Sequence, residues 1–121
     1  PRVPADLKDH RCIRHTVLTP RNEWPLRVGQ RTVMVPINTV LASNDVASVL
    51  DACMAGLGLG MFLSYMVRQP ISDGRLRYVL ERFATGPTPV QIVHVSSRLV
   101  SCNVRTFVDE CAEELRHGDF N

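Results

Sequence analysis

Two short segments place polar side chains at the predicted start of a helix, where a small anion could bind. The first is Ser43-Asn44-Asp45, which follows the branched, apolar run 38–42 and precedes a helix predicted from Val46. The first turn of a helix carries unpaired amides and about half a positive charge, so it attracts carboxylates and phosphates. The second is Leu63-Ser64-Tyr65, where an apolar run again leads through a hydroxyl to a predicted helix start.

Helix capping alone would also explain these residues. The side chain of Asn44 or Asp45 can accept a hydrogen bond from the free amides of the first helical turn. The sequence leaves two interpretations open, capping alone and capping combined with ligand contact. If the two helix starts lie side by side, they could line one polar cleft, because ligands of open α/β sheets favour the carboxyl ends of strands. The candidate ligand-binding residues are Ser43, Asn44, Asp45, Leu63 and Ser64.

Three other patterns could suggest an enzyme, and each has a simpler explanation. Glycines 56, 58 and 60 alternate as in a nucleotide-binding loop, but they end a predicted helix and open a strand, the reverse of what such a loop needs. His10 and Cys12 could share a strand face, yet no histidine adjoins a serine or cysteine in a recognisable catalytic arrangement. The carboxylates at 109–114 fit the solvated face of a helix. We therefore predict no catalytic residue and no cofactor.

Cysteine spacing and overall charge exclude further classes. The cysteines at 12, 53, 102 and 111 form no CxxC pair, so we predict no metal site and reduced, buried thiols. A net charge of +2 is too small to indicate a nucleic-acid partner, and the basic first 35 residues fit a solvated surface. The longest apolar run, 54–67, is broken by three glycines and is shorter than the ~20 residues of a membrane helix. With no signal peptide evident, we expect a cytoplasmic protein without a membrane partner.

Strands and helices alternate along most of the 121 residues. A connector at 1–7 is followed by a strand at 11–18 and a hairpin around Gly29. The helix from Val46 should end at Gly56, and a helix capped by Ser64 should be limited by Pro70. A break at 85–89 is a candidate hinge. The remaining predicted elements are strands at 38–42, 59–63, 75–80 and 90–95 and a last helix capped by Ser101. This order predicts an α/β sandwich with a partly parallel sheet.

Four segments, in the same order, resemble the effector-binding domain of LysR-type transcriptional regulators. They are PADLKDHRCIRH at 4–15, VMVPINTVLASND at 33–45, ACMAGLGLGMFLSYMVRQPISDGRLRYVL at 52–80 and VQIVHVSSRLVSCNVRTFVDECAEEL at 90–115. The third segment is the most specific, and together the four cover nearly the whole chain. Two departures matter: Ser64 stands where the family usually has proline, and Val95-Ser96 stands where it often has a pair such as Tyr-Pro.

The resemblance implies a type II periplasmic-binding-protein-like fold, in which two α/β lobes enclose a ligand cleft. Residues 1–85 would form most of lobe two, and 86–121 would form the hinge with a strand and helix that return to lobe one. It also implies that the chain is incomplete, because the winged helix-turn-helix, the linker helix and the start of lobe one are missing. The returning strand would lack its sheet partners, so we expect residues 90–115 either to associate with another chain or to be poorly packed.

The expected function is that of a sensory module. A small anionic effector would bind between the lobes, and DNA would be contacted only through the absent helix-turn-helix of a homo-oligomeric regulator. The alternative is a fragment of a periplasmic-type solute-binding protein, which the lack of an export signal disfavours. A small hydrolase or transferase using His or Cys is a third possibility, but no assembled nucleophile and base support it.

Overall fold

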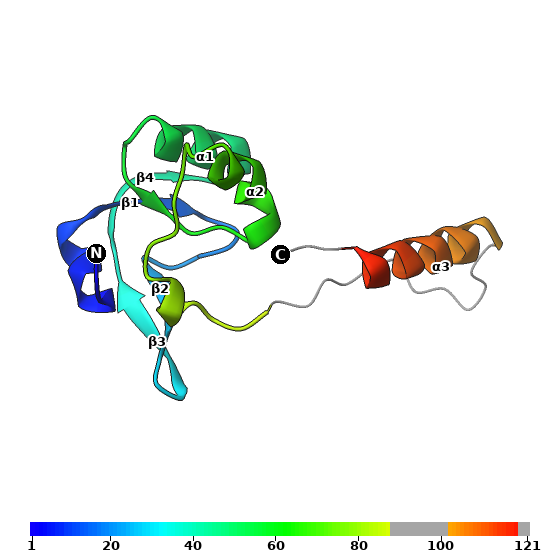
Figure 1. Ribbon diagram of the computed structural model, residues 1–121, viewed down its shortest axis with the longest axis horizontal. Helices are drawn as coiled ribbons and strands as arrows, with labels where there is room; N and C mark the ends of the chain where they lie inside the picture. Colours follow the sequence, from blue (N-terminus) through cyan, green and yellow to red (C-terminus); the bar gives the residue numbers. More distant parts are fainter. Residues whose placement is uncertain (88–101, 119–121) are drawn as a thin grey trace. The chain divides into compact units, whose positions relative to one another are not determined.

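The computed structural model describes residues 1–87 and 102–118, and it divides the chain into two compact units, Pro1–Gly86 and Pro87–Asn121 (Figure 1). The boundary falls within the predicted break at 85–89. The two units are described separately below. Among the described residues, no helix is long and apolar enough to span a membrane.

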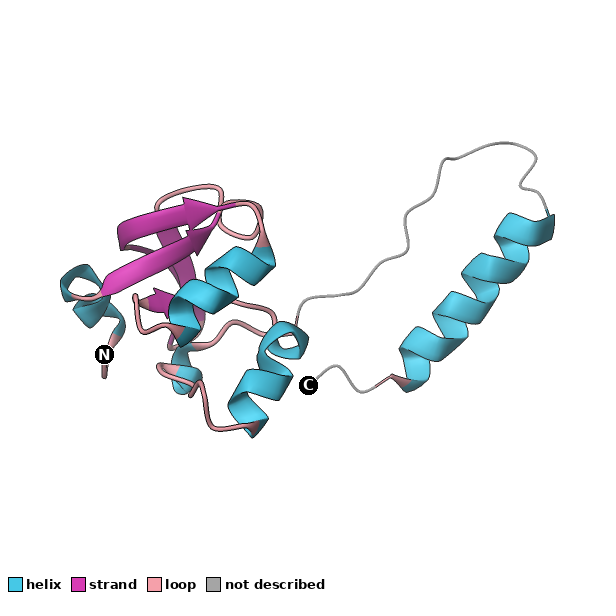
Figure 2. Ribbon diagram, turned by 90° about the horizontal axis from the view of Figure 1, so that it is seen from above, coloured by secondary structure: helices cyan, strands magenta, loops and turns pink. Residues whose placement is uncertain are grey.

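The first unit is built on a three-stranded parallel sheet with the strand order β4-β1-β5. Its members are β1 (Arg11–His15), β4 (Asn38–Ser43) and β5 (Leu59–Gly60). Helix α1 (Val46–Met54) connects β4 to β5 and therefore crosses β1, which lies between them (Figure 2). The α/β architecture with a parallel sheet is confirmed.

The side chains of neighbouring residues on β1 enter two separate cores, because successive side chains of a strand point to opposite faces. Ile13 is fully buried against Val49 and Cys53 of α1. Cys12 is fully buried on the other face, in a core to which the hairpin, the N-terminal segment and the chain before β4 contribute. The sheet is thus covered on both sides, as the buried strands of an α/β fold require.

A hairpin supplies much of the second core. Strands β2 (Glu23–Val28) and β3 (Arg31–Pro36) pair in an antiparallel register that sets Val28 opposite Arg31. The two-residue loop begins at Gly29, whose φ of 63° suits the first central position of a type II′ turn. The hairpin predicted around Gly29 is confirmed, and Trp24 and Leu26 are its buried residues.

The N-terminal segment differs from the extended connector that the sequence predicts. Residues Pro4–Asp9 form a 3-10 helix, η1. The Asp6 carboxylate accepts hydrogen bonds from the amides of Arg2 (2.7 Å) and Val3 (3.1 Å), which closes the first turn. Leu7 is consequently carried into the second core, where it is 1% exposed.

Three predictions for residues 59–80 need correction. The strand expected at 59–63 is only the two-residue β5, and no strand forms at 75–80, where the chain runs without regular pairing into the 3-10 turn η2 (Glu81–Phe83). Helix α2 (Ser64–Ser72) contains Pro70 instead of stopping before it. A proline near the last turn removes a single helical hydrogen bond, and Gly74 then closes the helix by donating to the Ile71 carbonyl (3.0 Å).

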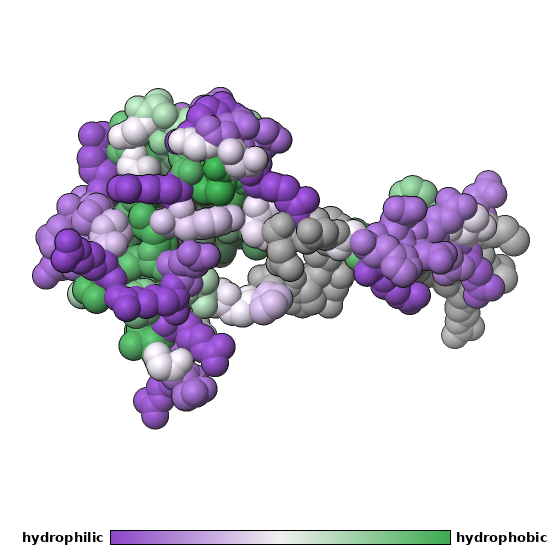
Figure 3. Space-filling model, in the orientation of Figure 1, coloured by the Kyte–Doolittle hydropathy of each residue, from purple (hydrophilic) through white to green (hydrophobic). Residues whose placement is uncertain are grey.

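Of the second unit, the structure describes mainly helix α3 (Cys102–His117). The strand predicted at 90–95 and the Ser101 cap lie outside the described residues. The predicted acidic face is confirmed, since Asp109, Glu110, Glu113 and Glu114 are all exposed. Figure 3 accordingly shows a mostly hydrophilic surface over α3, although the apolar Phe107 is also 64% exposed.

Candidate functional site

The carboxyl ends of the three parallel strands gather the candidate residues at one edge of the sheet. Strand β4 ends at Ser43 and leads into α1, whereas the chain after β5 leads into α2 at Ser64. Strand β1 lies between them and ends at His15 (Figure 1). The two helices therefore follow the strands that lie on either side of β1. That they share one cleft remains a prediction.

The start of α1 is capped from within the chain. As predicted for Asn44 or Asp45, one of the two is the N-cap: the Asp45 carboxylate accepts hydrogen bonds from the Ser48 amide (2.9 Å) and hydroxyl (2.6 Å). The Ser43 hydroxyl accepts from the Asp45 amide at 3.1 Å. The two hydrogen bonds from Ser48, together with smaller contributions that include the nearby His15 ring, hold the pKa of Asp45 below its ordinary value of 3.8. A negative charge of the protein thus already occupies this helix end.

The start of α2 is different. Ser64 was predicted to be the cap, but it is the first residue of the helix, and Leu63 is the N-cap. The Leu63 side chain makes no capping hydrogen bond, because it carries no acceptor. Amides at a helix start without a side-chain cap are suited to an external carboxylate or phosphate. The two similar sequence patterns therefore give one helix whose N-cap side chain is a charged acceptor and one whose N-cap side chain is not an acceptor.

His15 is the polar residue at this edge that the sequence analysis did not single out. It is 6% exposed and pairs in register with Ser43. Because His15 lies two residues after Ile13 on β1, its side chain projects to the face that α1 covers. The alternation of Ile13 and His15 was visible in the sequence, but the face covered by a helix was not.

The hydrogen bond that His15 accepts fixes the roles of its two ring nitrogens. Its Nδ1 accepts from the Leu18 amide at 3.1 Å. In a neutral imidazole only one nitrogen carries the proton, so the Nε2 of His15 is the donor. That nitrogen is buried and has no hydrogen-bond partner among residues 1–87 and 102–118. A buried donor left in this state costs about 1–3 kcal/mol.

The glycine run has the structural role predicted for it. Gly56 has a φ of 80° and ends α1, its amide donating to the Cys53 carbonyl at 3.0 Å. A Cβ atom at Gly58 would overlap the Arg11 carbonyl, and one at Gly60 would lie 2.7 Å from the Cys53 sulfur. These positions allow β5 to approach β1 and α1 closely.

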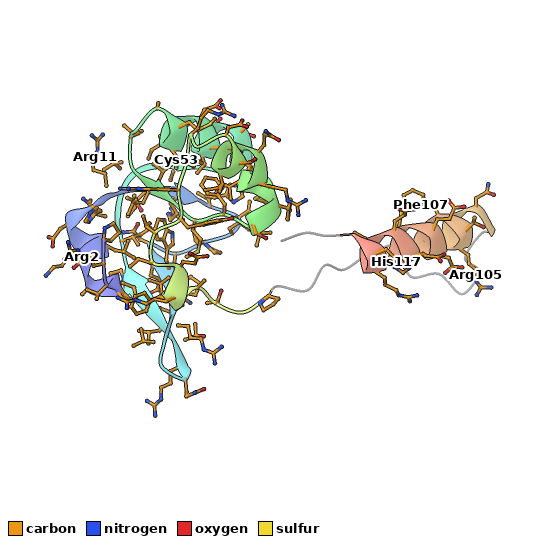
Figure 4. The ribbon with its side chains drawn as sticks, in the orientation of Figure 1. Arg2, Arg11, Cys53, Arg105, Phe107 and His117 are labelled. Carbon is orange, nitrogen blue, oxygen red and sulfur yellow. The ribbon has the colours of Figure 1, made fainter. Side chains whose placement is uncertain are left out.

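Neither the cysteines nor the pair formed by His10 and Cys12 supports catalysis. Cys12, Cys53 and Cys111 are free thiols, and burial raises the pKa of Cys53 to about 11 (Figure 4). The ring of His10 lies 2.9 Å from the Asp6 carbonyl, while the Cys12 thiol donates to the His10 carbonyl at 3.6 Å. Within the described residues, no group of three or more His, Cys, Asp or Glu could hold a metal ion.

Comparison with known proteins identifies the family. Residues 1–116 match the model of the LysR substrate binding domain. The chain belongs to this family. It is 32% identical over 111 residues to the uncharacterized HTH-type transcriptional regulator YcaN of Escherichia coli, covering 90% of this chain and 35% of that protein. It is 30% identical over 113 residues to an HTH-type transcriptional regulator of Xanthomonas campestris, covering 90% and 33%.

The fold of this LysR-family chain agrees with a solved structure. The regulatory domain of AphB from Vibrio vulnificus has a TM-score of 0.70 and 24% identity, over 93% of this chain and 56% of that one. The type II periplasmic-binding-protein-like fold is thereby confirmed. The family consists of transcription regulators rather than enzymes. The chain spans about a third of the length of the curated relatives it matches.

Proposed function

We propose that this LysR-family chain is the part of a sensory module that binds a small anionic effector between two lobes. The contacts would come from Ser43, Asn44, Asp45, Leu63 and Ser64. The observation that carries the proposal is that the two strands on either side of β1 in a parallel sheet each lead, beyond their carboxyl ends, into a helix start. The carboxyl ends of the strands are where open α/β sheets bind their ligands.

The unequal capping suggests how the effector would be oriented. Its negative group would lie toward the start of α2, where the N-cap residue Leu63 offers no acceptor. The ionised Asp45 would repel that group and would instead accept a hydrogen bond from a hydroxyl or amino group of the effector. The exposed Asn44 amide can serve either kind of group.

The proposal extends to the whole regulator. Residues 1–85 would form most of lobe two, and 86–121 would form the hinge with the strand and helix that return to lobe one. A helix-turn-helix domain outside this chain would contact DNA, in a cytoplasmic homo-oligomer. The effector would act by binding one lobe arrangement more tightly than the other, because only a difference in affinity can shift their populations.

A thermal-shift screen of small carboxylic acids on the intact regulator tests the proposal. We expect at least one acid to raise the melting temperature of the wild type, and this rise to shrink in Asn44→Ala and Ser64→Ala. Ser72→Ala is the matched control, because it removes an exposed hydroxyl at the opposite end of α2. If the two site variants keep the full response to an acid that stabilises the wild type, the site is wrongly assigned.

A further inference from the structure

His15 ends the central strand of the sheet, between the strands that lead into the two helices. Its strand lies between β4 and β5, and its register partner Ser43 is the last residue of β4. Residues opposite each other on parallel strands project to the same face, so both side chains lie on the face of the sheet that α1 covers. At 6% exposure, His15 is one of the two buried polar residues of the described chain.

The imidazole of His15 presents a hydrogen-bond donor in a fixed orientation. The bond from the Leu18 amide to Nδ1 orients the ring and assigns the proton to Nε2. Val49 and Ile13, both fully buried, belong to the same face of the sheet. In such surroundings an apolar side chain would avoid the free-energy cost of burying an N–H without a partner. The presence of a histidine at this position is explained if an acceptor reaches its Nε2–H during function.

We propose that His15 binds the effector directly. Its Nε2–H would donate to a carboxylate oxygen, and a hydroxyl or amino group of the same molecule would donate to the Asp45 carboxylate. This inference rests on the function proposed above and narrows the effector to a hydroxy acid or an amino acid. Asp45 is the acceptor that such a group needs, because its carboxylate is exposed and held ionised by the bonds from Ser48.

Recognition by His15 would also move the protein. The Nε2 atom is buried in the structure, so a carboxylate reaches it only when the groups that cover it move aside. Binding would therefore be coupled to a local displacement around the end of β1.

The test uses the intact regulator with nitrogen-15-labelled histidine, titrated at constant pH with glycolate, acetate and acetamide. We expect glycolate to shift the Nε2 resonance of His15 saturably, acetate to bind more weakly and acetamide to leave the resonance unchanged. His15→Phe should weaken glycolate binding about tenfold or more, the usual contribution of a hydrogen bond to a charged group. His15→Gln keeps an N–H donor and should therefore retain part of the affinity. This variant keeps the test valid if the Phe variant does not fold.

Two further variants complete the design. Asp45→Asn preserves the cap but removes the charge, so it should reduce the preference for glycolate over acetate. His117→Phe on the exposed end of α3 is the matched control and should change nothing. If the amides of Asn44 and Ser64 respond to glycolate while His15 Nε2 does not, the inference about His15 is wrong and the proposed function stands. If none of these resonances responds to either acid, both proposals fail.

Discussion

The beginnings of α1 and α2 look alike in sequence and differ in structure. At α1, Asp45 accepts from the Ser48 amide and hydroxyl, and Ser43 accepts from the Asp45 amide. At α2, the N-cap Leu63 makes no side-chain bond, and the first helical residue is Ser64. A charged N-cap such as Asp45 stabilises the fold by neutralising the helix start, whereas an N-cap leucine supplies no such charge. The difference depends on which residue holds the N-cap position.

The two helices also differ in how firmly they are held, and a matched pair of core substitutions tests this with the largest expected effect. Val49 of α1 is 0% exposed within a core cluster shared with β1, whereas Val67 of α2 is 5% exposed and belongs to neither core cluster. Val49→Ala should lower the free energy of unfolding by about 2–3 kcal/mol, and Val67→Ala by less. Urea denaturation measures both. An equal loss would mean that α2 is as integral to the core as α1.

The cap of α1 should matter to stability in a way that depends on pH. Asp45→Ala should lower the melting temperature by several degrees, whereas Asp45→Asn should lower it little at neutral pH, because asparagine is an equally good cap. Since the folded pKa of Asp45 lies below 3.8, its stabilising effect is present above about pH 4 and is lost as the pH falls through the folded pKa. Calorimetry from pH 7 to pH 2 should therefore show a shallower acid decline in Asp45→Asn. An unchanged acid decline would show that Asp45 titrates equally in the folded and unfolded chain.

The smallest effect is expected from giving α2 the cap that it lacks. Leu63→Ser would supply an acceptor to the first amides of α2, so an external anion should bind about twofold to fivefold more weakly. Leu63→Ala is the control, since it removes the same side chain without adding an acceptor. Titration calorimetry with a stabilising acid from the screen compares the two. Equal affinities would indicate that the anion does not lie at the start of α2.

Local patterns predicted much of the fold. The hairpin around Gly29, the strand before Ser43, a cap at Asn44 or Asp45 and the glycine that ends α1 each follow from chemistry within a few residues. The errors lie where the outcome depends on distant partners. Residues 75–80 include Tyr78 and Val79, which favour strands, yet they find no sheet partner among the described residues. Leu7 was expected in an extended segment, but its side chain is buried in a core cluster with residues that are distant in the sequence.

By itself, the sequence determined the family, the α/β class and the polar segments at two helix starts, because periodicity, caps and turns depend on residues that are neighbours in the chain. Only the tertiary structure decided that β1 lies between β4 and β5, so that His15 ends the strand between those that lead into the two helices. It also decided that Asp45 caps α1 while Leu63 leaves α2 without a side-chain cap. The reason is physical: strand order and the exact start of a helix are set by which faces can be buried together, and that depends on the whole chain at once.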